Sequence, residues 1–287
     1  MDSPPFVDEM VRVRPAAALR SYVAWYTGYR QEGIAPAQHY GMPSPYLTLI
    51  FTLDDPMTIA GHSDPRQAPG DYVTMIGGLH TTPALITHPG RQSGIQLALN
   101  PLGARTLLGL PAGELANIDL PADAVLGRGC AELQERLRAA RTWPDRFALV
   151  DDLLRRTVHP IGGVPPEVVH AWQTLVRTGG NISVSALADE AGWSSRHLAD
   201  RFNREIGLTP KAAARVIRFD RARQLLAGPP TRLADLAARC GYFDQAHLAR
   251  EFRAMAGLAP SNWLNEEFRN VQAAASEAAE ESVVTQT

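Results

Sequence analysis

The strongest constraint on the fold is an internal duplication in the last third of the 287-residue chain. The run "VSALADEAGWSSRHLADRFNREIGLTP" (184–210) repeats as "LADLAARCGYFDQAHLAREFRAMAGLAP" (233–260). Gly192 matches Gly241 at an offset of 49, and after one inserted residue His197 matches His247 at an offset of 50. Matches in so regular an order are not expected by chance, so both copies should fold alike.

Each copy predicts two short helices separated by a glycine turn. Gly192 and Gly241 stand where a tight turn favours positive φ without a Cβ penalty. Ser194 and Asp244 are candidate N-caps of the second helix. Apolar residues fall on one face of that helix, namely Leu198, Phe202 and Ile206 in the first copy and Leu248, Phe252 and Met255 in the second. This pattern is a helix-turn-helix, whose second helix can lie in the DNA major groove.

The segment between the copies predicts one long helix, with Thr209 as its cap and Pro210 at its first position. About nineteen residues would make it roughly 28 Å long. That length is near the roughly 34 Å between successive major-groove faces of B-DNA. Two reading helices could therefore contact adjacent groove segments on one side of a duplex.

Residues from about 178 to 268 resemble the DNA-binding domain of the AraC/XylS family of bacterial transcription regulators. The resemblance is carried by "GYFDQAHLAREFRAMAGLAPS" and by "RFDRARQLLA" upstream of it. It implies sequence-specific binding to double-stranded promoter DNA. It also implies base contacts from the outer faces of the reading helices, by Ser195, Arg196, Ala199, Asp200, Asn203, Gln245, Ala246, His247, Ala249 and Arg250. Phosphate contacts are expected from Ser194, Arg204, Lys211, Arg215, Arg218, Arg232, Asp244 and Arg253.

Asp200 departs from the family pattern, which commonly has a basic residue at this position. The second copy keeps Arg250 there. An acid repels phosphate but can accept a hydrogen bond from a cytosine amine. The sequence leaves open whether the first helix reads unusual bases or binds weakly.

The N-terminal part predicts a different architecture, so the fold class is α+β with two domains. Short β-rich runs separated by turn residues favour a small antiparallel barrel or sandwich with flanking helices. These runs are Pro45–Leu53, Met57–Gly61, Asp71–Gly78, Pro83–His88 and Ser93–Leu99, preceded by an expected helix at Pro15–Tyr22 and a strand at Trp25–Arg30. From Asn100, a capped start and apolar residues three and four apart predict helices.

These patterns predict four segments. Residues 1–160 form a sensor or dimerisation domain, β-rich to about 100 and helical over 101–158. Residues 161–177 are a linker and a leading helix. Residues 178–268 are the DNA-binding domain, and the acidic tail 269–287 is expected to be disordered.

The N-terminal domain is expected to bind a small-molecule effector or to pair the chain into a homodimer, and RNA polymerase is a further candidate partner. Pocket candidates among the strands are Trp25, Tyr26, His39, Tyr46, His62 and His80. Several histidines in a small barrel could form a cupin-type metal site, but the dense His-x-His spacing of such sites is absent. No metal or cofactor is therefore expected.

A metal-dependent or DNA-repair enzyme with a helix-turn-helix targeting domain is the alternative function. Alkyl-acceptor repair proteins combine a similar domain with a cysteine cluster or a Pro-Cys-His-Arg nucleophile, and neither Cys130 nor Cys240 stands in such a context. No G-x-S-x-G or Walker motif is present either, so no catalytic residue is expected. Without an apolar run of 18 residues or a signal pattern, the chain is expected to be cytoplasmic with no membrane partner.

Overall fold

The computed structural model describes residues 6–158 and 163–265, and its N-terminal part is built on two antiparallel sheets. A six-stranded sheet has the order β1-β2-β9-β4-β7-β10 and a four-stranded sheet has the order β3-β8-β5-β6. The strands are β1 (Val7–Val13), β2 (Val23–Glu32), β3 (Ala37–Gly41), β4 (Leu47–Thr52), β5 (Met57–Gly61), β6 (Gly70–Tyr72), β7 (Thr74–Gly77), β8 (Ala84–His88), β9 (Gln92–Leu99) and β10 (Asp119–Leu120). The two sheets do not close into a barrel.

One face of the six-stranded sheet is covered by helices. Tyr26, Leu49 and Leu97 project from this face into a buried cluster with Phe147 and Val150. The covering elements are the short α1 (Ala104–Leu108) and α2 (Asp123–Leu126), followed by α3 (Gly129–Ala139) and α4 (Trp143–Arg156). Two short 3-10 helices, η2 (Pro101–Gly103) and η3 (Ala112–Leu115), flank α1. As expected, Asn100 caps the first of these, since its side chain accepts from the N–H of Leu102.

Among the edge strands, sequence patterns missed β1, β3 and the two-residue β10. The first two carry several polar residues, and edge strands are commonly charged or polar, which hides the apolar signal. The expected strand Asp71–Gly78 is in fact two strands, because the chain passes from one sheet to the other at Val73. The expected helix at Pro15–Tyr22 was wrong beyond a single 3-10 turn, η1 (Ala17–Leu19). The expected strand at Trp25–Arg30 lies within β2.

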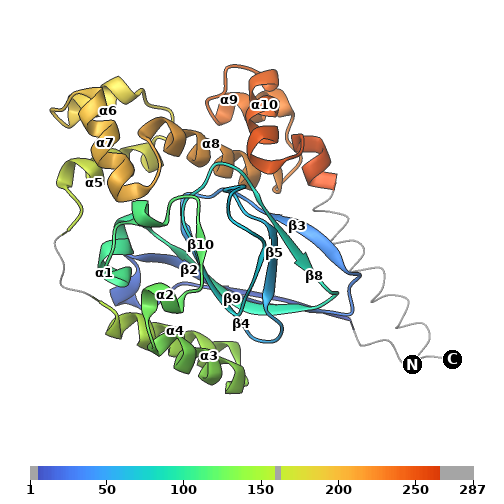
Figure 1. Cartoon of the computed structure of the whole chain (residues 1–287). Helices are drawn as coiled ribbons and strands as arrows, with labels where there is room; N and C mark the ends of the chain where they lie inside the picture. Colours follow the sequence, from blue (N-terminus) through green and yellow to red (C-terminus); the bar gives the residue numbers. More distant parts are fainter. Residues whose placement is uncertain (1–5, 159–162, 266–287) are drawn as a thin grey trace.

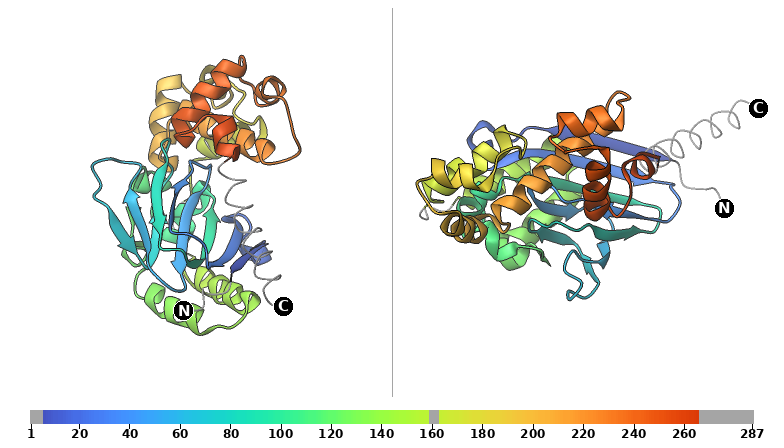
Figure 2. Two further views of the ribbon diagram at one scale, coloured as in Figure 1. Left: turned by 90° about the vertical axis from the view of Figure 1, so that its right-hand side faces the viewer. Right: turned by 90° about the horizontal axis from the view of Figure 1, so that it is seen from above.

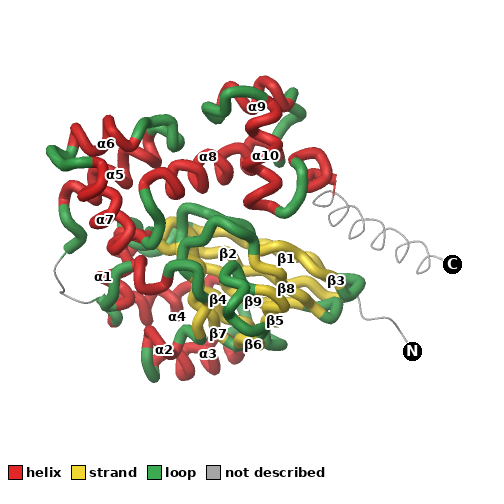
Figure 3. Tube along the Cα trace, turned by 45° about the horizontal axis from the view of Figure 1, so that its top comes forward, coloured by secondary structure: helices red, strands yellow, loops and turns green. Residues whose placement is uncertain are grey.

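The C-terminal part is helical and shows the duplication directly. After α5 (Pro166–Arg177), the pair α6 (Val184–Glu190) and α7 (Ser195–Ile206) is followed by α8 (Pro210–Leu226) and by the pair α9 (Leu233–Arg239) and α10 (Gln245–Ala256). The two pairs lie at opposite ends of α8, above the sheets (Figures 1 and 3). With 17 residues, α8 is roughly 26 Å long. Residues 260–265 are also helical.

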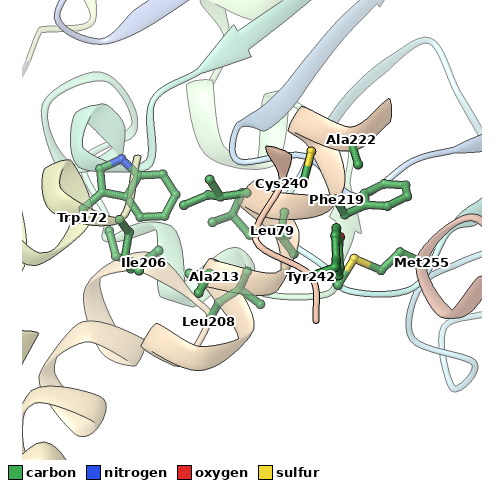
Figure 4. Close-up of a cluster of buried hydrophobic side chains, with 14 of the residues drawn as sticks. Leu79, Trp172, Ile206, Leu208, Ala213, Phe219, Ala222, Cys240, Tyr242 and Met255 are labelled. Carbon is green, nitrogen blue, oxygen red and sulfur yellow. The ribbon is translucent and has the colours of Figure 1, made fainter. Parts of the chain in front are cut away.

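The two parts of the chain pack against each other (Figure 2). Leu79, which follows β7, is fully buried within the core cluster of the C-terminal helices, among residues such as Trp172, Ile206 and Tyr242 (Figure 4). Arg105 on α1 binds Glu205 on α7 through two hydrogen bonds of 2.7 and 2.9 Å. Gly113 approaches the end of α7 so closely that a Cβ there would collide with the carbonyl oxygen of Arg204. The first helix pair is therefore held directly by the sheet-containing part.

Each of the four predicted segments has residues outside the described part of the chain. These are residues 1–5 and 159–160 of the first segment, 161–162 of the linker, 266–268 of the DNA-binding domain and the whole of the tail 269–287. In the described part of the chain, no helix is both long enough and apolar enough to cross a membrane.

Candidate nucleic-acid interface

The first reading helix, α7, begins at a well-formed cap. The side chain of Ser194 accepts from the N–H of His197, and Gly207 ends the helix in the left-handed conformation at φ 93°. Leu198, Phe202 and Ile206 are buried, as the apolar spacing predicted. The expected base-contacting residues lie on the opposite side, where Ser195, Arg196, Asp200 and Asn203 are exposed and Ala199 is half-buried.

The second reading helix, α10, has the same construction. Asp244 accepts from the N–H of His247 at 2.6 Å, and Gly257 ends the helix at φ 76°. Its buried face consists of Leu248, Phe252, Met255 and Ala256. Gln245, Ala246 and Arg250 are exposed, while His247 and Ala249 are half-buried. The predicted caps and buried faces are thus confirmed in both copies.

The glycine turns also match. Gly192 and Gly241 adopt φ of 65° and 74°, the left-handed region that favours glycine. After each glycine, an aromatic residue donates its backbone N–H to the preceding helix, from Trp193 to Ala188 and from Tyr242 to Ala237, both at 2.9 Å. The two units therefore correspond residue by residue, at an offset of 49, up to this aromatic position.

His197 and His247 serve the local structure of their turns. The ring of His197 meets Trp193 edge-on at 4.6 Å, and the ring of His247 meets Tyr242 at 5.3 Å. Nδ1 of His247 also accepts the backbone N–H of Phe243 at 3.2 Å. Although His247 was assigned to the base-reading face, one side of its ring is committed to the turn.

The expected phosphate-contacting residues fall into two groups. Most are exposed, namely Ser194, Arg204, Lys211, Arg232, Asp244 and Arg253, and two of these, Ser194 and Asp244, already use their side chains to cap α7 and α10. Arg215 and Arg218 instead bind partners within the protein. Nε of Arg215 donates to Glu251 at 2.7 Å, and Arg218 donates to the carbonyl oxygen of Gly180 at 2.9 Å.

Arg218 also lies over the ring of Tyr242, 5.7 Å from its centroid. Burial is the main cause that raises the pKa of Tyr242, and the nearby Glu251 adds to it. Arg215, Arg218, Glu251 and Tyr242 thus form a cluster that fixes α10 against α8. Sequence reasoning missed Glu251 in this cluster, because a single acid on a polar helix face gives no signal of its partner.

The expected pocket residues do not converge on one site. Trp25 and Tyr46 meet edge-on with ring centroids 4.6 Å apart. Tyr26 points to the opposite, helix-covered face, where its hydroxyl donates to Asp151 at 2.8 Å, and burial and this carboxylate raise its pKa. His39 lies beside His88, and burial together with that neighbour lowers the pKa of His39 to about 4.

The remaining two histidines are tied into the structure. His62 is fully buried and its Nδ1 lies 2.7 Å from a carboxylate oxygen of Asp119, which joins the end of β5 to β10 and so links the two sheets. Nδ1 of His80 lies 2.6 Å from the carbonyl oxygen of Thr82, and burial lowers the pKa of His80. Among the described residues, no group of three or more His, Cys, Asp or Glu is arranged to hold a metal ion.

Trp25 does line a cavity of about 450 Å³ at the β1–β2 edge of the six-stranded sheet. The cavity is basic, because its other lining residues are Arg12, Val13, Arg14, Arg20, Val23 and Ala24. The guanidinium of Arg12 lies 5.0 Å from the ring centroid of Trp25. The sequence pattern indicates Trp25 but not these arginines, because Arg12 lies on the unpredicted strand β1 and Arg14 and Arg20 lie in the chain that follows it.

Comparison with known proteins agrees with this geometry. Residues 187–266 match the family described as "Helix-turn-helix domain", and residues 11–121 match a "Domain of unknown function (DUF6597)". Over 68 residues the chain is 34% identical to YbfI of Bacillus subtilis, described as an uncharacterized HTH-type transcriptional regulator. This match covers 24% of this chain and 24% of YbfI. Over 87 residues it is 31% identical to the HTH-type transcriptional regulator Rv1931c of Mycobacterium tuberculosis, covering 30% of this chain and 34% of that protein.

These sequence matches span about a quarter to a third of the relatives' own lengths. A solved structure of an apo ToxT variant from Vibrio cholerae covers 90% of this chain and 96% of its own, with a TM-score of 0.52 and 9% sequence identity. That similarity shows a shared two-part fold. Two capped reading helices, the glycine turns and the family match together establish that residues 187–266 are an AraC-type helix-turn-helix domain.

Proposed function

We propose that the protein is a transcription regulator that binds specific promoter sequences in double-stranded DNA through α7 and α10. The observation that carries the proposal is the pair of capped reading helices at opposite ends of α8, each with an uncovered polar face. The contacts of the sheet-containing part with α7 involve Glu205 and the backbone near Arg204, at the end of the helix away from its cap. Arg196, Asp200 and Asn203 therefore stay exposed.

The second reading helix carries the stronger base-reading chemistry. Arg250 can donate two hydrogen bonds to a guanine edge, Gln245 can pair with adenine, and Ala246 can pack on a thymine methyl. On the first helix, Arg196 offers the same guanine chemistry, while Asp200 offers an acceptor for a cytosine amine. The two halves of the recognition site should therefore differ in sequence.

The phosphate contacts are expected mainly from Lys211, Arg253, Arg204 and Arg232, whose side chains are exposed. Arg215 and Arg218 would have to leave Glu251 and Gly180 to reach DNA, so we assign them first to the support of α10. Each phosphate contact should contribute about one unit to the slope of the logarithm of the binding constant plotted against the logarithm of the salt concentration.

Selection of binding sites from random DNA with the purified full chain tests this function. The Arg250→Ala variant should bind the selected site more weakly, losing roughly 1–3 kcal/mol of binding free energy, and should relax one base preference. Arg136→Ala is the matched control, because Arg136 is exposed on α3, outside the DNA-binding domain. Unchanged affinity in Arg250→Ala, or failure of the wild type to select any sequence, would contradict the assignment.

The basic cavity at Trp25 is the place where we propose that a small-molecule effector binds. Three arginines around apolar and aromatic residues favour an anionic organic molecule over a neutral one. Calorimetric titration with a panel of aliphatic and aromatic carboxylates tests this, with Arg14→Ala as the variant expected to lose binding. Equal binding of the matching neutral amides would argue against an anion site.

We further propose that the regulator works in the cytoplasm, as a homodimer in contact with RNA polymerase, and that it is not an enzyme. The relatives described as transcriptional regulators support the regulatory role over an enzymatic one. Sedimentation of the purified chain with and without its selected DNA tests the dimer. Metal analysis tests the enzyme alternative, which stoichiometric iron or zinc would revive.

A further inference from the structure

The second helix-turn-helix unit is one residue longer than the first, and the structure identifies the extra residue. The aromatic positions Trp193 and Tyr242 are equivalent at an offset of 49, because both donate to the same place in the preceding helix. The caps Ser194 and Asp244 are equivalent at an offset of 50, because each accepts from the third residue of its helix. Phe243 is therefore the extra residue in the turn of the second unit.

Phe243 is 92% exposed, the highest value among the exposed large apolar residues of the described chain. Burial of an aromatic side chain of this size normally stabilises a protein, so its exposure calls for a physical reason. The turn at Phe243 is ordered by a hydrogen bond, in which its backbone N–H donates to Nδ1 of His247. The phenyl ring therefore projects from a fixed backbone position into solvent.

The usual structural role for an apolar residue before an N-cap does not apply to Phe243. Such a residue often packs against the fourth residue of the helix, which here is Leu248. Leu248 is completely buried, whereas Phe243 is almost completely exposed, so this contact is not made. The preceding aromatic residue, Tyr242, is the one that packs into the helical core, and it is 5% exposed.

The position of Phe243 points to DNA as its partner. It immediately precedes the N-terminus of α10, and the N-terminal residues of a recognition helix are the ones that contact base edges. The carboxylate of Asp244 next to it is engaged by the helix N–H of His247. Among base edges in the major groove, the thymine 5-methyl group is the apolar one, and phenylalanine is among the side chains that contact it.

We propose that Phe243 is a specificity-determining residue that packs on a thymine methyl in the half of the site read by α10. This inference rests on the proposed function and adds one contact to it. The first unit lacks the extra residue, so only the α10 half of the site should depend on this methyl group. Removing one methyl from a buried apolar contact costs about 0.8 kcal/mol, which corresponds to about fourfold in affinity.

The experiment uses the full chain and its selected DNA site. The base position relaxed by Arg250→Ala marks the half-site of α10, and each thymine in or beside it is replaced singly by deoxyuridine, which lacks the methyl. One replacement should weaken wild-type binding about fourfold. Phe243→Ala should weaken binding to the thymine site at least fourfold and should no longer distinguish thymine from deoxyuridine there.

Two controls make the result specific. Phe243→Leu keeps an apolar side chain and should retain part of the thymine preference. Met10→Ala removes another exposed apolar side chain, 71% exposed on β1, and should change neither affinity nor preference. Because Phe243 is exposed, its variants should melt like the wild type, which circular dichroism checks.

Three results separate the possibilities. If the wild type binds its site but Phe243→Ala binds equally well with the same response to deoxyuridine, the inference is overturned while the proposed function stands. If Phe243→Ala binds normally but fails to regulate transcription, the ring contacts a protein and the inference is again overturned. If the wild type selects no site, the proposed function itself fails.

Discussion

Leu79→Ala should destabilise the DNA-binding domain, although Leu79 belongs to the sheet-containing part of the sequence. The side chain is 0% exposed and lies within the helical core cluster with Trp172, Ile206 and Tyr242 (Figure 4). Truncating a fully buried leucine to alanine costs about 2–5 kcal/mol, from lost transfer free energy and the cavity left behind. We expect about 3 kcal/mol here, because rigid elements on several sides limit collapse of the cavity.

Hydrogen exchange followed by mass spectrometry locates this loss. A change of about 3 kcal/mol should speed exchange of the protected amides in α8 by more than 100-fold if they exchange through opening of this core. Leu97→Ala is the matched control, since Leu97 is also 0% exposed but lies on β9 in the other core cluster. Its variant should accelerate exchange in β2 and β4 instead.

One hydrogen-exchange pattern would contradict a supporting role of Leu79 in the helical core. If Leu79→Ala left exchange in α8 unchanged and affected only the strands, Leu79 would not support the helical core. A loss below about 0.5 kcal/mol would also contradict it, since that is the range of surface substitutions.

Two further predictions concern charges. Arg105→Ala should lower the free energy of unfolding by about 1–3 kcal/mol, because it leaves the largely buried Glu205 unpaired. A double-mutant cycle with Glu205→Gln, read by urea unfolding, should show coupling, and simple additivity would contradict the pair. The pKa of His39 is lowered to about 4 in the folded chain, whereas a histidine in the unfolded chain has a pKa of about 6.5. Between these two pH values the unfolded chain binds the proton and the folded chain does not, so the free energy of unfolding should fall as the pH drops from about 6.5 to 4. His39→Gln should reduce this fall in urea titrations, and an unchanged pH profile would contradict the assignment.

The duplicated region was the part most accessible to sequence reasoning. Its caps, glycines and apolar faces act within a few residues of one another, so the local pattern already contains Ser194, Gly207 and Leu198 in their observed roles. The same holds for Thr209, which caps α8 as expected. Local hydrogen bonding and helical periodicity are sufficient for such features.

Contacts between distant segments could not be predicted in this way. Nothing near Leu79 indicates that it joins a core formed by residues 168–263, and nothing near Arg105 indicates that it pairs with Glu205, 100 positions away. The polar edge strand β1 was missed, and with it the arginines of the cavity at Trp25. The sequence did reveal that one residue is inserted in the second unit, but only the hydrogen bonds of the caps and aromatic residues identify it as Phe243.

The ion pair between Arg105 and Glu205 gives the two reading helices unequal attachments. Trp25 beside the cavity pairs with Ala98 on β9, and that strand leads through Asn100 into the short helix that carries Arg105. A shift of β9 by a bound molecule would thus be carried to α7 over a few residues of chain. The second reading helix instead forms its ion pair with α8, between Glu251 and Arg215, and meets β3 through packing of Gly257 beside the ring of Tyr40. An effector at Trp25 would act on the alignment of α7 relative to α10, and so on the spacing between half-sites that the protein tolerates.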